Sequence, residues 1–280
     1  MTPSLVIAVV ASALCIGAGT VAGQPSSVAR ASAIARLPVL RVNVRDGAVV
    51  APDSVSSGWT RLHVMMEGSA HIVVAFRLHD GERPADAATF LAALDTARAT
   101  PPGGLALSGP EVVDTGDVAL DLKPGRYVLA CMRRGADGHR HRSAGESKPF
   151  VVVARRAGAR TAAAPVPTAT VRMIDFAYTG PERWPSGEHW VRVTNEGKED
   201  HLVIVARMRD GATLRDWTSV PDPNRIAQPL AGAARMGPGT VTFLHLSMQS
   251  GRYVLYCLIP HAPTGKTHVA LGMFREIIVE

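Results

Sequence analysis

Apolar residues recur at every second position in many short segments of this chain of 280 residues, which is the pattern of half-buried β-strands. Two such segments are 39–44 and 171–176, and Gly, Pro, Asn or Asp stands between most of the segments. Helical periodicity is confined to two connections, at 84–99 and, in a shorter form, at 212–220. The pattern predicts an all-β protein built from β-sandwiches.

The chain also contains an internal repeat. The sequence KPGRYVLAC at 123–131 recurs as QSGRYVLYC at 249–257, and HIVVAFR at 71–77 recurs as HLVIVAR at 201–207. After the cysteine of each copy come a matching His and a final apolar strand. Landmarks that repeat in the same order indicate a duplicated domain.

We therefore expect two tandem Greek-key β-sandwich domains, each with a short helical insertion. The boundaries that follow from the repeat are 37–154 and 169–280. The segment between them, 155–168, is rich in Ala, Pro and Arg, which is typical of a linker.

Residues 1–23 contain no charged side chain and form an apolar run that ends in small residues. This predicts a secretory signal peptide cleaved near Ala22 or Gly23, and hence a secreted or periplasmic protein. An uncleaved membrane anchor is the alternative. Cleavage would leave only Cys131 and Cys257, which are too few for a disulfide-built scaffold. No other segment is long and apolar enough to span a bilayer.

The formal charge of +6 comes from 30 basic and 24 acidic residues, and the basic residues are scattered along the chain. A mildly basic surface of this kind favours acidic partners. A nucleic-acid role would need clustered basic residues with interleaved aromatics, and aromatics make up 5% of the chain. Sequence motifs of hydrolases and of phosphate-binding loops are absent.

The candidate chemistry lies in segment 251–273, which contains Cys257, His261, His268 and Met273. Cys257 shares one face of its strand with the apolar residues two and four positions before it, so its sulfur should point inward. A thiolate, imidazoles and a distant thioether form the ligand set of blue-copper sites. The segment is therefore a candidate metal site.

The order of these residues resembles the cupredoxin family, the blue type 1 copper proteins, in which a Cys, a loop His and a Met close the fold. In that family a first His comes from a distant strand that follows an Asn, and Asn195 and His201 fit this pattern. The resemblance implies that His201, Cys257, His268 and Met273 bind one type 1 copper. It also implies one-electron transfer with a redox partner protein.

Two histidines compete for the loop position. Four residues, 269–272, separate His268 from Met273, which is the spacing that the resemblance implies, whereas His261 lies much farther away. In the internal repeat His268 corresponds to His141, and His261 has no counterpart. Both observations favour His268. The loop from Cys257 to His268 is longer than in many cupredoxins.

The first copy retains His71, Cys131 and His141 as a weaker candidate site. Glu146 stands where the alignment places Met273, and the loop before it is rich in arginine. We expect this loop to admit water, which a thiolate copper centre does not favour. The first copy is accordingly expected to be a degenerate, structural one.

Two alternatives remain open from the sequence. The chain can be a metal-free cupredoxin-like structural or binding module, or a protein of copper trafficking or storage. An enzyme of the two-domain copper type is disfavoured, because in such enzymes a His adjoins the type 1 Cys. Here Cys257 lies between Tyr256 and Leu258.

Overall fold

The computed structural model describes residues 36–78, 110–112, 116–135, 138, 140–220 and 225–280. The expected signal peptide at 1–23 and the helix expected at 84–99 lie outside these residues, so both stay predictions. The other expected helix is present as α3 (Leu214–Ser219), which starts with a capping box between Thr213 and Asp216. Among the described residues no helix is long and apolar enough to cross a membrane.

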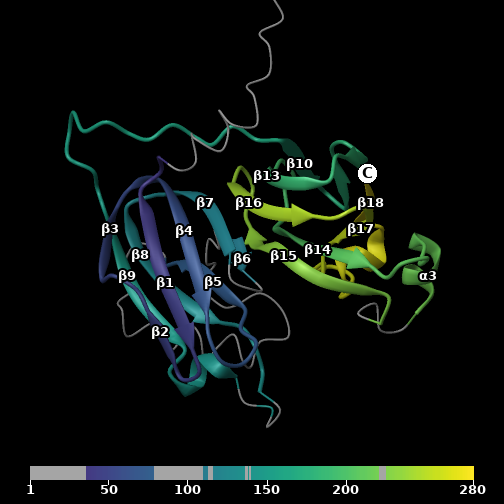
Figure 1. Ribbon diagram of the computed structural model, residues 1–280, viewed down its shortest axis with the longest axis horizontal. Coiled ribbons are helices and arrows are strands. Elements are labelled where there is room, and N and C mark those ends of the chain that lie inside the picture. The colour runs from purple at the N-terminus through teal and green to yellow at the C-terminus, as the bar shows by residue number, and fades with distance from the viewer. Residues whose placement is uncertain (1–35, 79–109, 113–115, 136–137, 139, 221–224) are drawn as a thin grey trace, which may run out of the picture.

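The N-terminal half is drawn in purple to teal in Figure 1, and its described residues form mainly strands. In β1 the side chains of Leu40, Val42 and Val44 are buried and the residues between them are exposed, as the alternating sequence predicts. The elements of this half are β1 (Val39–Arg45), β2 (Ala48–Val50), β3 (Ser54–Ser56), β4 (Gly58–Met66), β5 (Val73–Arg77), β6 (Pro110–Val112), β7 (Gly116–Leu122), β8 (Gly125–Cys131), the 3₁₀ turn η1 (His141–Ala144) and β9 (Ser147–Val153).

The C-terminal half, green to yellow in Figure 1, repeats this arrangement. In this half β10 pairs in parallel with β13, as β1 pairs with β4 in the other half. Its elements besides α3 are β10 (Ala169–Ile174), β11 (Ala177–Thr179), β12 (Arg183–Trp184), β13 (Gly187–Asn195), β14 (His201–Met208), β15 (Ala227–Met236), β16 (Val241–Met248), β17 (Gly251–Tyr256), the 3₁₀ turn η3 (His268–Leu271) and β18 (Phe274–Val279).

Strands of both halves belong to two sheets that run through the whole molecule. One sheet has the order β11-β10-β13-β16-β7-β4-β1-β2, and the other has the order β12-β18-β17-β14-β15-β6-β5-β8-β9-β3. The halves meet where β16 pairs with β7 and β15 pairs with β6. These pairings satisfy strand edges that would otherwise be open. The predicted all-β class with tandem sandwiches is confirmed, and the edge-to-edge joining of the sheets was not predicted.

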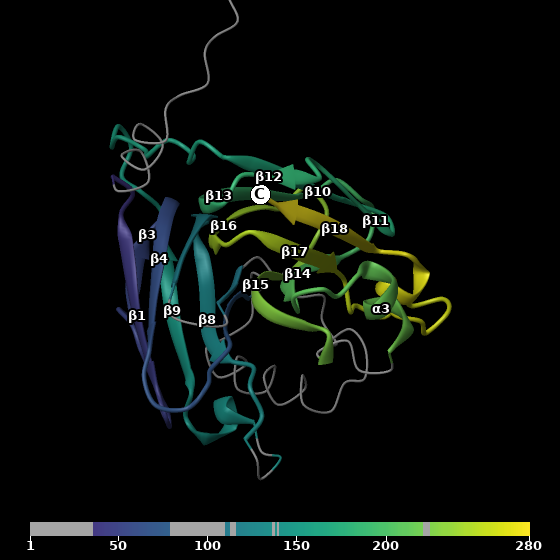
Figure 2. The ribbon, with the colours of Figure 1, turned by 45° about the vertical axis from the view of Figure 1, so that its right-hand side comes forward.

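The two sandwiches stand side by side in Figure 2, with the strands of the N-terminal half nearly upright and those of the C-terminal half nearly level. The segment between β9 and β10 contains no strand or helix. It passes along the outside of the molecule from one sandwich to the other (Figure 1). The domain boundaries themselves stay a prediction.

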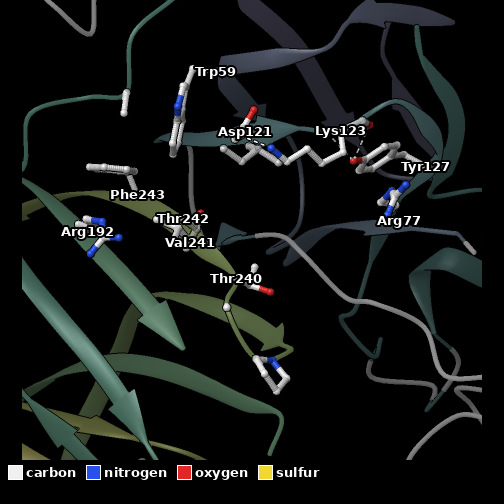
Figure 3. A pocket seen from close by; sticks show the side chains of 14 residues that line it. Trp59, Arg77, Asp121, Lys123, Tyr127, Arg192, Thr240, Val241, Thr242 and Phe243 are labelled. Carbon is white, nitrogen blue, oxygen red and sulfur yellow. Dashed lines mark hydrogen bonds and ion pairs between the residues drawn. The ribbon is translucent and has the colours of Figure 1, made fainter. Parts of the chain in front are cut away.

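A pocket of about 500 Å³ lies where β7 and β16 join the two halves (Figure 3). The rings of Trp59 and Phe243, one from each half, meet edge to face there with centroids 5.2 Å apart. Lys123 pairs with Asp121 at the same pocket, and Arg192 approaches from the other half. Aromatic packing across the pocket thus adds to the backbone pairing that joins the sandwiches.

The internal repeat is visible in the hydrogen bonds at the start of the cysteine strands. In β8 the hydroxyl of Tyr127 donates to the carbonyl of Lys123 at 3.0 Å and accepts from its amide at 3.2 Å. In β17 the hydroxyl of Tyr253 makes the same two bonds with Gln249, at 2.9 and 3.1 Å. Both rings are buried. Each tyrosine therefore fixes the turn that leads into its cysteine strand.

We expect Tyr253→Phe to lower the free energy of unfolding by about 1–2 kcal/mol, because it leaves an amide and a carbonyl of the turn without their partner. Tyr127→Phe should lower it by a similar amount. Urea unfolding followed by circular dichroism measures both. Unchanged midpoints in the two variants would contradict the role assigned to these turns.

Candidate metal centres

Three candidate ligands of the C-terminal half converge at one end of its sandwich. His201 is the first residue of β14, Cys257 follows β17, and His268 is the first residue of η3. The Nδ1 atoms of the two histidines are 3.1 Å apart, and Sγ of Cys257 lies 3.5 Å from Nδ1 of His268. All three side chains are buried. They form a group that could hold a metal ion.

The loop after Cys257 folds back over the sulfur through backbone hydrogen bonds. The amide of His268 donates to the carbonyl of Ile259, and the amide of Val269 donates to that of Cys257, both at 2.8 Å. A short turn then ends at Gly272, whose φ of 104° is the left-handed conformation that favours glycine. The long loop is thus closed by a regular set of bonds that place His268 beside the thiol.

Met273 lies directly beside the cysteine. The amide of Cys257 donates to the carbonyl of Met273 at 3.2 Å, and the amide of Met273 donates to the carbonyl of His268 at 2.9 Å. The side chain of Met273 is fully buried in the same apolar cluster as Cys257 and Ile259. The backbone and the packing therefore place Met273 next to Cys257, and its role as a ligand stays a prediction.

The thiol of Cys257 lies in an apolar cluster and also has polar neighbours. The amide of Leu202 donates to Sγ of Cys257 at 3.5 Å. Burial raises the pKa of the Cys257 thiol, and burial followed by the nearby His201 lowers the pKa of His268. Both shifts favour neutral side chains without a bound ion, so a cation that replaces the thiol proton would stabilise the charged thiolate.

The orientation of His201 is set by Asp175, which the sequence analysis missed. Nε2 of His201 lies 3.0 Å from Oδ1 of Asp175. A carboxylate only accepts hydrogen bonds, so Nε2 carries the hydrogen and Nδ1 presents its lone pair to the group. Burial opposes ionisation of Asp175, but hydrogen bonds from His201 and from the amides of Glu199 and Lys198 outweigh it and lower its pKa.

Asn195 closes the turn that carries His201, in the position that the cupredoxin resemblance implied. Its Nδ2 donates to the carbonyls of Glu199 and Met236, at 2.8 and 2.7 Å, and its Oδ1 accepts from the amide of Gly197 at 2.9 Å. The side chain is completely buried. Each of its polar atoms thus serves the loop rather than the metal group.

The competing His261 lies outside the group. Its Nδ1 is 3.0 Å from the hydroxyl of Thr264, and its Nε2 is 3.3 Å from a carboxylate oxygen of Glu199. The other oxygen of Glu199 lies 3.4 Å from Nε2 of His268. The ring of Phe176 packs edge-on against both histidines. His261 therefore belongs to the cover over the group.

The N-terminal half brings His71, Cys131 and His141 together in the corresponding place. Sγ of Cys131 lies 3.9 Å from Nδ1 of His71. The carboxylate of Glu146 enters the same group, with Oε2 at 2.9 Å from Nδ1 of His71 and 3.2 Å from Nδ1 of His141. Burial is the main cause that raises the pKa of Cys131 to about 11.

The arginine-rich loop does not open this group to water, contrary to the expectation from the sequence. His71, Cys131 and Glu146 are all buried, and the side chain of His141 is 16% exposed. Arg142 is itself buried and donates to the sulfur of Met132. Loop composition alone gave a wrong indication because it does not show how deeply tertiary packing buries the residues of the group.

Comparisons with known proteins give similarities to copper proteins. No protein-family model matches the chain, and neither does any curated protein. Among solved structures it is similar to reduced auracyanin from Roseiflexus castenholzii, with 17% identity over 40% of this chain and 94% of that one and a TM-score of 0.29. It is also similar to a Cu-containing nitrite reductase from Thermus scotoductus, with 14% identity over 86% and 61% of the chains and a TM-score of 0.24.

Likenesses with such low TM-scores carry no weight for function, so the geometry itself defines the class of the protein. Two tandem β-sandwiches each bring a His, a Cys that ends a strand and a second His together at one end. In these respects the fold is cupredoxin-like, as the sequence resemblance implied.

We expect Asp175→Asn to weaken metal binding by the C-terminal group about tenfold, because an amide can donate to Nε2 as well as accept from it and no longer fixes the ring. Titration with Co²⁺ in a Cys131→Ser background, read from the thiolate charge-transfer band, measures the affinity of the C-terminal group. Asp210→Asn is the matched control, since Asp210 is an exposed carboxylate of the same half. Equal affinities in the two variants would contradict the positioning role of Asp175.

Proposed function

We propose that this protein transfers single electrons through one type 1 copper held in its C-terminal domain. His201 and His268 would be the equatorial imidazole ligands, Cys257 the thiolate and Met273 the axial thioether. The strongest support is the buried group in which Nδ1 of His201, Nδ1 of His268 and Sγ of Cys257 meet. A backbone hydrogen bond joins Met273 to Cys257 beside this group.

The donor set fits copper better than other common ions. Two imidazoles and a thiolate with a weak thioether are typical of blue-copper sites, whereas structural zinc sites use four strong N, S or O ligands. Bound copper would supply a one-electron couple between its two oxidation states. The carboxylate of Asp175 behind His201 is the kind of outer partner that orients a metal-binding histidine.

The chain's own residues would keep the site rigid and dry during electron transfer. Leu202 donates its amide to the sulfur and so stabilises negative charge there. Phe176 covers the ring of His268, and Ile259 packs beside the thiol. A buried group whose ligands are fixed by the backbone needs little rearrangement when its charge changes.

Electrons would enter near the surface residue that follows the cysteine. The side chain of Leu258 is 44% exposed, although it is apolar and adjoins Cys257. A partner protein could dock on such an apolar spot beside the ligand. The formal charge of +6 suits an acidic redox partner. In this proposal the protein is secreted or periplasmic and is a carrier rather than an enzyme.

The first test is the colour of the purified protein loaded with Cu²⁺. It should show an intense blue thiolate-to-copper band with one blue copper per chain. Cys257→Ser should remove the band, and Cys131→Ser should leave it unchanged. Full copper loading without a blue band would rule out the type 1 site and favour the metal-free module or a storage role.

A second test separates the two loop histidines. His268→Ala should abolish the blue band, because it removes a nitrogen that lies 3.5 Å from the sulfur. His261→Ala should retain the band, because that ring contacts Thr264, Glu199 and Phe176 instead. The visible spectra of both variants at equal copper loading decide the matter. The reverse result would mean that the loop binds the metal in another register.

A further inference from the structure

We propose that the N-terminal domain contains a second metal site of different chemistry, in which His71, Cys131, His141 and Glu146 hold a divalent ion of the zinc type. This inference is independent of the copper site in the C-terminal domain. It assigns Glu146 as a ligand and makes the domain a metal-binding one in place of the degenerate copy expected from the sequence.

The four ligand atoms lie close enough together for one ion to contact them all. Bonds of about 2.0–2.3 Å from zinc to N, O and S place neighbouring ligands about 3.3–3.8 Å apart. Here the four atoms all lie within 4.8 Å of one another. Oε2 of Glu146 lies 2.9 Å from Nδ1 of His71 and 3.2 Å from Nδ1 of His141, and the sulfur of Cys131 is 3.9 Å from Nδ1 of His71.

The backbone of Glu146 makes the same hydrogen bonds in the N-terminal half as the backbone of Met273 makes in the C-terminal half. The amide of Cys131 donates to its carbonyl at 2.9 Å, and its own amide donates to the carbonyl of His141 at 3.2 Å. Gly145 before it has a φ of 99° and ends the turn as Gly272 does in the other half. The carboxylate is therefore delivered by the backbone that delivers the thioether in the C-terminal domain.

The carboxylate is also oriented from behind. The amide of Gly47 donates to Oε1 of Glu146 at 3.1 Å, which leaves Oε2 facing the two histidines. Nε2 of His71 lies 3.2 Å from the carbonyl oxygen of Glu67, which only accepts hydrogen bonds. Both ring nitrogens of His71 therefore face acceptors. In a neutral ring with its hydrogen on Nε2, Nδ1 turns a lone pair toward the carboxylate, and either a second proton or a bound cation would relieve that arrangement.

Lone pairs that face one another need a positive charge between them. Nδ1 of His141 is buried and, among the described residues, has no hydrogen-bond partner, although Oε2 of Glu146 lies 3.2 Å away. Buried polar atoms are normally paired, and an unpaired one calls for an explanation such as an ion. A cation at the centre would satisfy both histidines, the carboxylate and the sulfur together.

The charge of the ligands selects a divalent ion over reduced copper. Thiolate and carboxylate together carry two negative charges, so a divalent ion leaves the buried group neutral, whereas Cu⁺ would leave it negative. Net charge is costly in a buried site. In the C-terminal group the thiolate is the charged ligand, and Cu⁺ leaves that group neutral. A carboxylate oxygen is also a hard ligand that does not favour Cu⁺.

The test uses the full chain with Cys257→Ser, which disables the C-terminal site. In competition with a chromophoric chelator, this protein should bind one Zn²⁺ per chain. Co²⁺ in place of Zn²⁺ should give the visible bands of a tetrahedral site together with a thiolate charge-transfer band. Adding Cys131→Ser should remove the charge-transfer band. Adding Glu146→Gln should weaken Zn²⁺ binding at least about tenfold.

Asp53→Asn is the control, because Asp53 is an exposed carboxylate of the same domain that pairs with Lys148 and not with the group. It should leave the affinity unchanged. If Glu146→Gln does not fold, His141→Ala replaces it, because the ring of His141 is not fully buried. This variant should also weaken Zn²⁺ binding. If Cys257→Ser itself does not fold, Cys257→Ala replaces it.

Two results would overturn the inference. Zn²⁺ binding no tighter than in the Cys131→Ser/Cys257→Ser double variant would show that the group is only a hydrogen-bonded network. An intense blue band on adding Cu²⁺ to Cys257→Ser would show that the N-terminal domain is a second type 1 site. That blue band would not contradict the proposal for the C-terminal domain. The C-terminal proposal concerns the blue band of the wild-type protein that Cys257→Ser removes.

Discussion

The pair of backbone hydrogen bonds that ties the last loop of each domain to its cysteine is the constraint on which the candidate sites depend. In the C-terminal half, Met273 accepts from Cys257 and donates to His268. In the N-terminal half, Glu146 accepts from Cys131 and donates to His141. The bonds involve only main-chain atoms, so they fix where a ligand stands and leave its chemistry to the side chain.

The two halves then differ beside the candidate sites. The turn after the first strand reads Asp46-Gly47 in one half and Asp175-Phe176 in the other. Gly47 supplies an amide to the carboxylate of Glu146. Phe176 has a φ of 62°, a conformation that costs a non-glycine residue on the order of 1 kcal/mol, and its ring covers His268. One turn thus supports a charged ligand and the other shields an apolar site.

Much of this arrangement could be predicted from the sequence because it is local or repeated. Strand alternation indicated the fold class, and the repeated segment around Tyr127 and Tyr253 indicated the duplication. Matching His141 to His268 selected the loop histidine that lies in the group. The repeat also placed Glu146 opposite Met273, and the backbone bonds of the structure agree with this alignment.

The rest depends on contacts between distant segments, which no local pattern encodes. Asp175 follows β10 of one sheet and reaches His201 at the start of β14 of the other sheet. Its match with Asp46, which follows β1 and lies near His71, becomes visible only in the structure. The joining of β7 to β16 depends on two strand edges that have no common sequence signal. Charge in the loop before His141 suggested an open site, whereas tertiary packing buries it.

The central claim is that the residue beside the cysteine decides which metal chemistry each domain supports. The most direct measurement is the visible spectrum of copper-loaded protein that carries Glu146→Met in the Cys257→Ser background. The account predicts an intense blue band that Cys257→Ser alone lacks, because Cys131, His71 and His141 then face a thioether. Stoichiometric copper without that band would contradict the account.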